Sequence, residues 1–469
     1  MRILLINPRS DNLFETFLPL GLAYIAGSLL RRGHEITVWD INAEKWSKEE
    51  VLNRIKETGG SYGLIGITAL AGDYKYVKWL SHSIKKIHPG IKIILGGYLS
   101  SALPEFLIRS FPIDYVAVGE GEKTMVELAE SLTDGSGPGL VKGIYFKDNS
   151  GNIVATPARP RLKNLDQLPF PSWEYFPMEA YLRERHISFG EHVENGSGMI
   201  SIMASRGCPF NCNYCDHTIK GHRVRYRTVG NVIEEIKLLL AGYGGKIGKF
   251  YFWDDILIWD RDWIFNFCET LIQEKLNIKW TCNCHVSMVE PRLMSLMKQA
   301  GCVNVRFGIE SGSQRILDSL NKGVKVERAL EALKVCLDAG LELTIYIMVG
   351  MIGENDETIN ETVKFFKRLS SPLFIKQIRK INFFMLTPFP GTGLFKTACE
   401  TGHIKNIDEF LERDFDTCYD IPINISGLAD PDLIRLKKGL EEAVRSIRDE
   451  KTLHLNDLLK DMRKELQAR

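Results

Sequence analysis

Three cysteines set close together constrain this chain more than any other feature of its sequence. The segment RGCPFNCNYCD holds Cys208, Cys212 and Cys215 at the spacing C-x3-C-x2-C. Three thiols on one short loop can converge on an iron–sulfur cube, in which thiolate is the usual ligand and four cysteines are the usual number. Because the local count stops at three, one iron stays open to a substrate or cofactor. Two other interpretations remain, which are packed core thiols and a zinc site that His217 completes.

The length and composition indicate a globular protein of several domains. A chain of 469 residues is too long for one ordinary core, and 44% of its residues are hydrophobic. The formal net charge of +1 gives no general attraction to nucleic acid. No apolar run reaches the ~18–20 residues that would span a bilayer, and the first residues do not resemble a signal peptide. We therefore expect a cytoplasmic protein, not integral to a membrane, with reduced thiols.

Residues 1–140 alternate short aliphatic runs with helix-like segments. The runs predict buried parallel strands at 3–6, 36–38, 64–67, 91–95 and 115–118, with helices at 18–32, 48–58, 74–87 and 123–132. This alternation is typical of a doubly wound α/β sheet of the Rossmann or flavodoxin-like kind. Ligands of such sheets bind beyond the carboxyl ends of the strands. The residues at those ends include Thr68, Leu70, Gly96, Gly97, Tyr98, Glu120 and Gly121.

Residues 141–198 are expected to form a hairpin followed by a proline-rich bridge. Two strand-like runs flank the turn Lys147–Gly151, which is a good hairpin signal. The prolines that follow are interleaved with aromatic residues, so the bridge is either a plain linker or a segment packed against both neighbouring domains.

Residues 199–398 show six further strand-like runs separated by helical patterns. The runs lie at 199–204, 250–252, 279–282, 304–308, 343–349 and 380–386. Six such units predict a partial (βα)6, TIM-like barrel, in which the chemistry lies at the carboxyl ends of the strands. The cysteine loop follows the first run, and polar or glycine residues follow later ones. Residues 399–469 are expected to form a helical region, either a solvated cap or a lid.

The cysteine loop and these strand ends together resemble the radical SAM superfamily. The loop CPFNCNYC is similar to that family's cluster loop, in which a [4Fe-4S] cluster chelates S-adenosylmethionine through its open iron. The resemblance implies that Cys208, Cys212 and Cys215 are the cluster ligands. It further implies that the residues contacting S-adenosylmethionine are Tyr214, Arg223, Asp254, Asp255, Glu310, Ser311 and Gly350. Arg225 is an alternative to Arg223 as the partner of the methionine carboxylate.

The N-terminal region resembles the cobalamin-binding domain fused to many radical SAM enzymes. PLGLAYIAGSL, the T-x-L segment, GGY and DYVAVGEGE carry this resemblance, which implies that the strand-end residues named above cradle cobalamin. One position departs from the methionine-synthase type of domain. Asn42 stands where that type has the histidine that ligates cobalt from below, so we expect no histidine ligand from this position.

The combined resemblance implies a cobalamin-dependent radical SAM methyltransferase. Such an enzyme abstracts hydrogen with a 5′-deoxyadenosyl radical and passes a methyl group from methylcobalamin to an unactivated carbon. The expected substrate is a small molecule or a lipid, and the expected partner is a one-electron donor such as flavodoxin or ferredoxin. The same domains could instead catalyse a tetrapyrrole-type cyclisation or a ring contraction. A corrinoid- or zinc-binding regulatory module is the non-enzyme alternative.

A second cysteine cluster, CNCH, lies in the third strand-like run of the reaction domain. Because side chains alternate along a strand, Cys282 and Cys284 should share one face and His285 should point away. That geometry argues against a second metal site. Contact with the substrate and simple packing both remain open for these residues.

Overall fold

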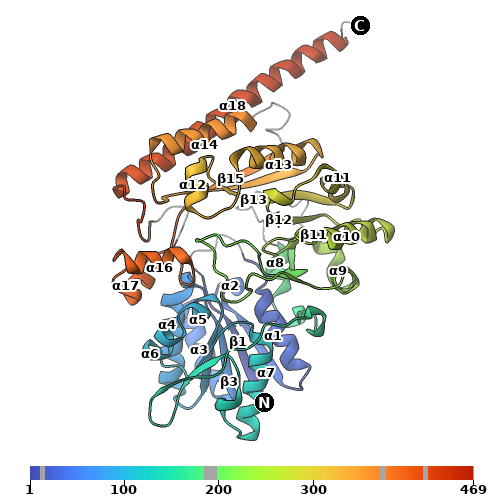
Figure 1. Ribbon diagram of the computed structural model, residues 1–469. Coiled ribbons are helices and arrows are strands. Elements are labelled where there is room, and N and C mark those ends of the chain that lie inside the picture. Colours follow the sequence, from blue (N-terminus) through green and yellow to red (C-terminus); the bar gives the residue numbers. More distant parts are fainter. Residues whose placement is uncertain (11–15, 184–197, 370–376, 416–420, 468–469) are drawn as a thin grey trace.

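Two α/β domains lie one on the other, and a long C-terminal helix projects from the upper one (Figure 1). The computed structural model describes residues 1–10, 16–183, 198–369, 377–415 and 421–467. Residues 184–197 of the expected bridge therefore lie outside the described residues. No helix in the described part of the chain is long and apolar enough to cross a membrane.

The lower domain is the expected doubly wound sheet. Its strand order is β2-β1-β3-β4-β5-β6-β7, and the first five strands are parallel. These strands are β1 (Arg2–Asn7), β2 (Glu35–Asp40), β3 (Leu64–Thr68), β4 (Lys92–Gly96) and β5 (Tyr115–Ala117). The helices are α1 (Leu20–Leu30), α2 (Ile41–Glu44), α3 (Lys48–Thr58), α4 (Tyr74–Ile87), α5 (Tyr98–Ala102), α6 (Pro104–Ser110) and α7 (Gly121–Asp134).

Alternation along the strands sends apolar side chains to both faces of this sheet. Ile3 and Leu5 of β1 pack into a core that includes α1 and α7, whereas Leu4 and Ile6 face a second core with α3 and α4. A parallel sheet covered on both faces needs such continuous aliphatic strands. The run of apolar residues in β1 is thus explained.

The predicted hairpin is present and extends the N-terminal sheet. Strands β6 (Ile144–Lys147) and β7 (Ile153–Ala155) pair antiparallel, and β6 pairs antiparallel with β5. The hairpin therefore belongs structurally to the lower domain. The bridge after it ends in the short helix α8 (Met178–Arg183), which contacts the first strand of the upper sheet.

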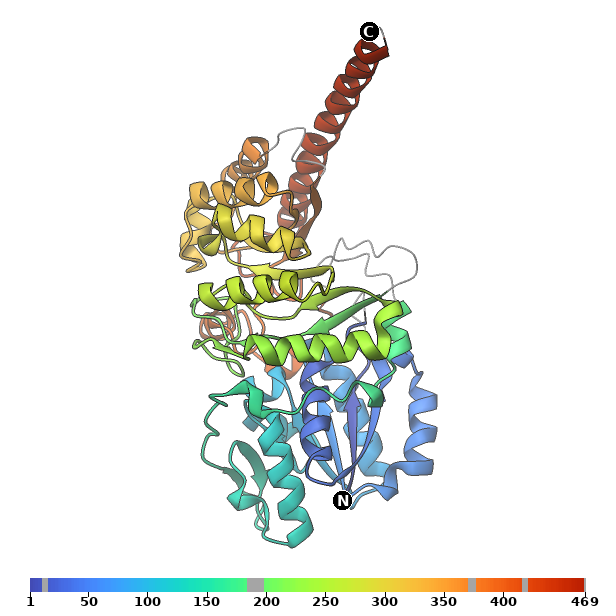
Figure 2. The same ribbon diagram turned by 90° about the vertical axis from the view of Figure 1, so that its right-hand side faces the viewer.

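The upper domain is a half-barrel of six parallel strands in the order β15-β14-β13-β12-β11-β8. The strands are β8 (Gly198–Ile202), β11 (Ile247–Phe252), β12 (Trp280–Cys284), β13 (Cys302–Glu310), β14 (Glu342–Val349) and β15 (Ile378–Met385). The helices are α9 (Val229–Tyr243), α10 (Arg261–Gln273), α11 (Pro291–Gln299), α12 (Gln314–Ser319), α13 (Val326–Asp338) and α14 (Asp356–Leu369). Figure 2 shows most of these helices stacked along one side of the domain.

The C-terminal region contacts both domains. Helices α16 (Gly393–Glu400) and α17 (Ile407–Leu411) lie beside α4 of the lower domain (Figure 1), where Lys78 Nζ lies 3.0 Å from Asp408 Oδ1. Helix α18 (Asp430–Gln467) runs along α14 and then projects beyond it. These contacts hold the two domains in one arrangement from the side opposite the bridge.

Candidate functional site

The three cysteines lie on a loop that a short antiparallel ladder closes. Strand β9 (Ser205–Arg206) pairs with β10 (Arg225–Tyr226) at the base of the loop. Gly207 begins the loop with φ of +107°, and a Cβ atom there would lie 2.5 Å from the carbonyl oxygen of Arg223. Only glycine fits this close approach in a left-handed conformation. The loop thus starts from a fixed stem directly after the first half-barrel strand.

The thiols are partly buried and interact with one another. Cys212 is buried, while Cys208 and Cys215 are half-buried. The hydrogen bond with Cys215 lowers the pKa of Cys212 to about 6, against the effect of burial, and the charge on Lys322 acts in the same direction. Burial raises the pKa of Cys208 to about 11. Thiolate is the form in which cysteine binds iron, and the nearby positive charge of Lys322 favours that form of Cys212.

The positions of the candidate ligands argue against the alternative of a zinc site that His217 completes. Among the described residues, no three His, Cys, Asp or Glu side chains meet at the spacing of one metal ion's ligands. His217 instead stacks on His222, with ring centroids 4.2 Å apart. The three thiols on one loop fit a multi-iron cluster, for which cysteine thiolates are the ordinary ligands.

A buried lysine beside the cluster loop joins two of the predicted residues. Lys322 Nζ donates hydrogen bonds to Tyr214 Oη at 2.8 Å and to Glu310 Oε1 at 2.9 Å. Tyr214 Oη also donates to Glu310 Oε1 at 3.0 Å. Lys322 and Glu310 are only 8% and 6% exposed. Gly308 allows this arrangement, because a Cβ atom there would lie 2.2 Å from Glu310 Oε1.

Lys322 is not recognisable as a site residue from the sequence alone. It stands in the turn after α12, where a lysine is ordinary, and nothing in the adjoining residues marks it as buried. Only the folded chain shows that it lies against the cluster loop, because its partners come from β13 and from the loop itself. A buried cation with one carboxylate partner near an open iron is suited to a second carboxylate, such as that of a methionine.

The two aspartates after β11 have different surroundings. Asp254 is 1% exposed and accepts hydrogen bonds from the backbone N–H groups of Ala204 and Ser205 and from Ser205 Oγ. Burial raises the pKa of Asp254 to about 7. Asp255 is more exposed, and its Oδ1 atom lies 2.9 Å from Lys220 Nζ of the cluster loop. Both therefore contact the segment that carries the cysteines.

The remaining predicted contacts of S-adenosylmethionine are spread over three positions. Ser311 Oγ is buried 3.2 Å from Thr362 Oγ1. Gly350, with φ of +103°, donates its N–H to Glu354 Oε2 at 2.5 Å. Arg223 is exposed, with its carbonyl oxygen against Gly207. The structure thus brings Tyr214 and Glu310 together near the cysteines but leaves the Arg223 side chain at the surface.

The carboxyl edge of the lower sheet, where the sequence predicts cobalamin to bind (the predicted cobalamin edge), exposes mainly backbone. Gly97 has φ of +98°, and a Cβ atom there would lie 2.7 Å from the carbonyl oxygen of Ala69 and 3.1 Å from Thr68 Oγ1. Gly96 has no neighbour within 4 Å at its Cβ position. Leu70 is 43% exposed. An exposed apolar side chain beside an open backbone turn suits a large ligand laid over this edge.

Tyr98 connects this edge with the cluster loop. Burial raises the pKa of Tyr98, and the positive charge of Lys220 opposes that rise through a contact and a hydrogen bond. Lys220 in turn pairs with Asp255. Tyr98 therefore lies within electrostatic range of the ion pair between Lys220 and Asp255.

Two further predicted residues lie at the start of α7. Glu120 Oε1 is 3.0 Å from a guanidinium nitrogen of Arg206 and 3.0 Å from one of Arg225. Gly121 packs closely on α1, because a Cβ atom there would lie 2.9 Å from Ile25 Cδ1. The Glu120 carboxylate is thus engaged with the stem of the cluster loop.

Asn42 stands where the methionine-synthase type of domain has the histidine that ligates cobalt. It is 4% exposed, and its Oδ1 atom accepts a hydrogen bond from the Ser10 N–H at 3.3 Å. The side-chain oxygen of Asn42 therefore has a partner within the protein.

The CNCH cysteines follow the predicted alternation. Cys282 Sγ and Cys284 Sγ lie 3.6 Å apart, and both side chains belong to the outer core of the half-barrel. His285 stacks on Phe210 of the cluster loop with ring centroids 3.7 Å apart. The histidine thus supports the cluster loop, while the cysteines pack.

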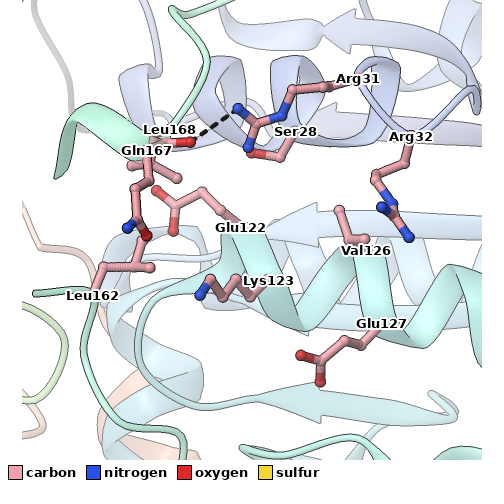
Figure 3. A pocket seen from close by; sticks show the side chains of 10 residues that line it. All are labelled: Ser28, Arg31, Arg32, Glu122, Lys123, Val126, Glu127, Leu162, Gln167 and Leu168. Atoms are coloured by element: carbon pink, nitrogen blue, oxygen red, sulfur yellow. Dashed lines mark hydrogen bonds between the residues drawn. The ribbon is translucent and has the colours of Figure 1, made fainter. Parts of the chain in front are cut away.

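A cavity of about 220 Å³ lies between α1, α7 and the bridge (Figure 3). Its lining is Ser28, Arg31, Arg32, Glu122, Lys123, Val126, Glu127, Leu162, Gln167 and Leu168. None of the predicted cofactor-binding residues is among them.

Comparison with known proteins agrees with the two domains described above. The radical SAM superfamily model matches residues 202–366, and the B12 binding domain model matches residues 11–129. The uncharacterized methyltransferase PH0819 of Pyrococcus horikoshii is 32% identical over 85% of this chain and 83% of that protein. The anaerobic magnesium-protoporphyrin IX monomethyl ester cyclase of Rubrivivax gelatinosus is 28% identical, over 89% of this chain and 73% of that protein.

A solved structure shares the fold. The radical S-adenosylmethionine methyltransferase TsrM of Kitasatospora setae, solved with cobalamin and a [4Fe-4S] cluster bound, superposes with a TM-score of 0.72. The alignment covers 95% of this chain and 88% of that chain at 17% identity.

The chain belongs to the radical SAM enzymes that carry a B12-binding domain. Its cofactors are the [4Fe-4S] cluster, S-adenosylmethionine and cobalamin, as predicted from the sequence. Its relatives include a methyltransferase at 32% identity and a cyclase at 28% identity. The comparison therefore supports methyl transfer more strongly than cyclisation.

Proposed function

We propose that this enzyme transfers a methyl group to an unactivated carbon of a small-molecule or lipid substrate. When bound, the cluster and S-adenosylmethionine supply hydrogen abstraction, and cobalamin supplies the methyl group. The observation that carries the proposal is the ion pairing of Glu120, at the carboxyl edge of the lower sheet, with Arg206 and Arg225 at the stem of the cluster loop. It brings the predicted cobalamin edge against the cluster loop, and methyl transfer needs both centres at one substrate.

Different residues around the cluster loop bind different groups of S-adenosylmethionine. Lys322 neutralises the methionine carboxylate, a role that sequence analysis gave to Arg223 or Arg225. Glu310 is an acceptor for a hydroxyl or ammonium group, and Tyr214 stays hydrogen-bonded to both. Buried, fixed charges bind an ionic ligand more strongly than solvated ones, because no water must reorganise around them.

The substrate lies against the inner face of the half-barrel. Arg306 and Tyr251 pack there, with the guanidinium carbon 4.1 Å from the ring centroid. Tyr251 Oη donates to Asn283 Oδ1 at 3.2 Å. These polar groups orient a substrate, while the apolar side chains on the opposite strand faces fill the outer core. A flavodoxin or ferredoxin is the proposed electron donor.

A cyclase activity is the second candidate. The 28% identity to the Rubrivivax gelatinosus cyclase favours it. Cyclisation and methylation differ in their products, because only methylation yields S-adenosylhomocysteine beside 5′-deoxyadenosine.

The test is an anaerobic assay of enzyme reconstituted with iron, sulfide and cobalamin. S-adenosylmethionine and titanium(III) citrate are added, and the nucleoside products are quantified. We expect both 5′-deoxyadenosine and S-adenosylhomocysteine. Formation of 5′-deoxyadenosine alone, in the presence of tetrapyrrole substrates that lose hydrogen, would favour the cyclase. Absence of an iron–sulfur absorption after reconstitution would exclude both activities.

A further inference from the structure

The two ends of the cluster loop are held by one carboxylate of the cobalamin-binding domain. Arg206 and Arg225 stand opposite each other in the β9–β10 ladder. Each places a guanidinium nitrogen 3.0 Å from Glu120 Oε1. Arg206 also reaches Glu122 Oε1 at 2.6 Å. The stem of the loop is therefore attached to the lower domain at both of its strands.

These charged groups are buried and closely matched. Arg206, Arg225, Glu120 and Glu122 are 6%, 8%, 7% and 3% exposed. The second oxygen of Glu120 accepts the Leu162 N–H at 2.8 Å, and Arg225 also donates to the Leu162 carbonyl oxygen at 2.7 Å. Buried ion pairs contribute little net stability compared with apolar packing, but they fix geometry, because an unpaired partner is strongly disfavoured.

The attachment joins the places where the two cofactors bind. Arg206 lies two residues before Cys208, and Glu120 lies three residues after β5, at the carboxyl edge of the lower sheet. Glu122 also lines the cavity in Figure 3. Movement of the Glu120 carboxylate would shift the loop relative to the cobalamin edge.

We propose that Glu120, supported by Glu122, is a positioning residue that sets the cluster loop at the distance and angle from the cobalamin edge that methyl transfer requires. The proposal rests on the function proposed above. In that function bound cobalamin would accept the methyl group of S-adenosylmethionine, whose sulfur would keep the bonding pair, so that S-adenosylhomocysteine would report this transfer. Reductive cleavage to methionine and 5′-deoxyadenosine would need one electron from the reductant and one hydrogen atom from the substrate or the medium, and no cobalamin. Only the first of these two reactions depends on the distance between the domains.

The test compares Glu120→Gln with the unaltered enzyme, both reconstituted with cluster and cobalamin. We expect S-adenosylhomocysteine formation to fall at least tenfold, while 5′-deoxyadenosine formation with titanium(III) citrate falls less than twofold. The magnetic interaction between the reduced cluster and cob(II)alamin, measured by electron paramagnetic resonance, should weaken or become heterogeneous. This second measurement reports the separation of the two centres without turnover.

Two further variants complete the test. Glu127→Gln is the matched control, because Glu127 is also an ion-paired carboxylate of α7 but its partner is Arg159, outside the cluster loop. It should leave both products and the magnetic interaction unchanged. Arg225→Lys keeps the charge but shortens the side chain and removes the guanidinium fork, and it gives a second route if Glu120→Gln does not fold. It should reproduce the split between the products.

Three results would overturn the proposal. The first is an unchanged product ratio and an unchanged magnetic interaction in Glu120→Gln and Arg225→Lys. The second is a parallel loss of both products together with loss of iron, which would indicate a merely structural role. The third is the same split in Glu127→Gln. If the unaltered enzyme forms 5′-deoxyadenosine but no S-adenosylhomocysteine, the methyltransferase function fails, and the magnetic interaction still decides the positioning role.

Discussion

Different chemical groups line the carboxyl edges of the two parallel sheets. At the edge of the lower sheet, Gly96 and Gly97 leave the backbone bare, and Leu70 exposes an apolar side chain. At the edge of the half-barrel, Lys322 and Glu310 are buried charges that contact each other. A large cofactor can be held by shape and backbone contacts, whereas a small zwitterion needs fixed charges. The same place in a parallel sheet, its carboxyl edge, is therefore lined in two ways that suit two kinds of ligand.

The largest effect is expected at the loop between these edges. Replacement of Cys212 by alanine should prevent assembly of the cluster and reduce 5′-deoxyadenosine to the background level, because too few thiolates remain to hold the cube. Iron content and absorption near 400 nm measure the cluster. Cys399→Ala is the control, since Cys399 lies in the last turn of α16, whereas that helix contacts the loop at its first turn, where the Leu394 N–H donates to the Asn213 carbonyl oxygen. A normal cluster in Cys212→Ala would contradict the assignment.

Removal of the buried positive charge at the half-barrel edge should lower the affinity for S-adenosylmethionine and leave the iron–sulfur cluster in place. Lys322→Met should raise the concentration of S-adenosylmethionine needed for half-maximal cleavage by about 10–100-fold, the range for a charge-assisted hydrogen bond. Titration followed by nucleoside analysis measures it. Lys325→Met is the matched control, because Lys325 is exposed three residues away. An effect equal to that of Lys325→Met would show that the charge at position 322 does not bind this ligand.

At the carboxyl edge of the lower sheet, an added methyl group should have a steric effect at Gly97 but not at the adjacent Gly96. Gly97→Ala places a methyl group 2.7 Å from a carbonyl oxygen in a left-handed conformation, so it should lower the free energy of unfolding by about 1–3 kcal/mol and reduce bound cobalamin. Gly96→Ala meets no neighbour within 4 Å in the protein. Urea denaturation separates the two variants. If Gly97→Ala retains both stability and cobalamin, the edge is less rigid than its geometry indicates.

The smallest effect concerns the carboxylate that holds the turn at Gly350. Burial raises the pKa of Glu354 from 4.5 to about 7. The folded protein therefore binds this proton more tightly than the unfolded chain, and the associated stability is lost as the pH rises through 7. Glu354→Gln should gain about 2 kcal/mol relative to the unaltered protein between pH 5.5 and pH 8. Glu357→Gln, at an exposed position, should show no such trend in urea denaturation.

Much of the fold could be predicted from local patterns. All five parallel strands of the lower sheet and all six of the half-barrel were expected, since strands buried on both faces need aliphatic runs. Helices α3 and α4 have the predicted ends. The hairpin was also predicted, but its place in the lower sheet depends on pairing with β5, a partner remote from the turn that marks it.

The sequence by itself determined the two domains and the loop with three cysteines, because ligand spacing and strand periodicity are local properties of the chain. Only the tertiary structure decided how charges are shared between the domains. It placed Lys322 beside Tyr214 and Glu310, and it turned Glu120 toward Arg206 and Arg225. Whether an ionic side chain is solvated or paired depends on which remote segment packs over it, and no local pattern of residues contains that information.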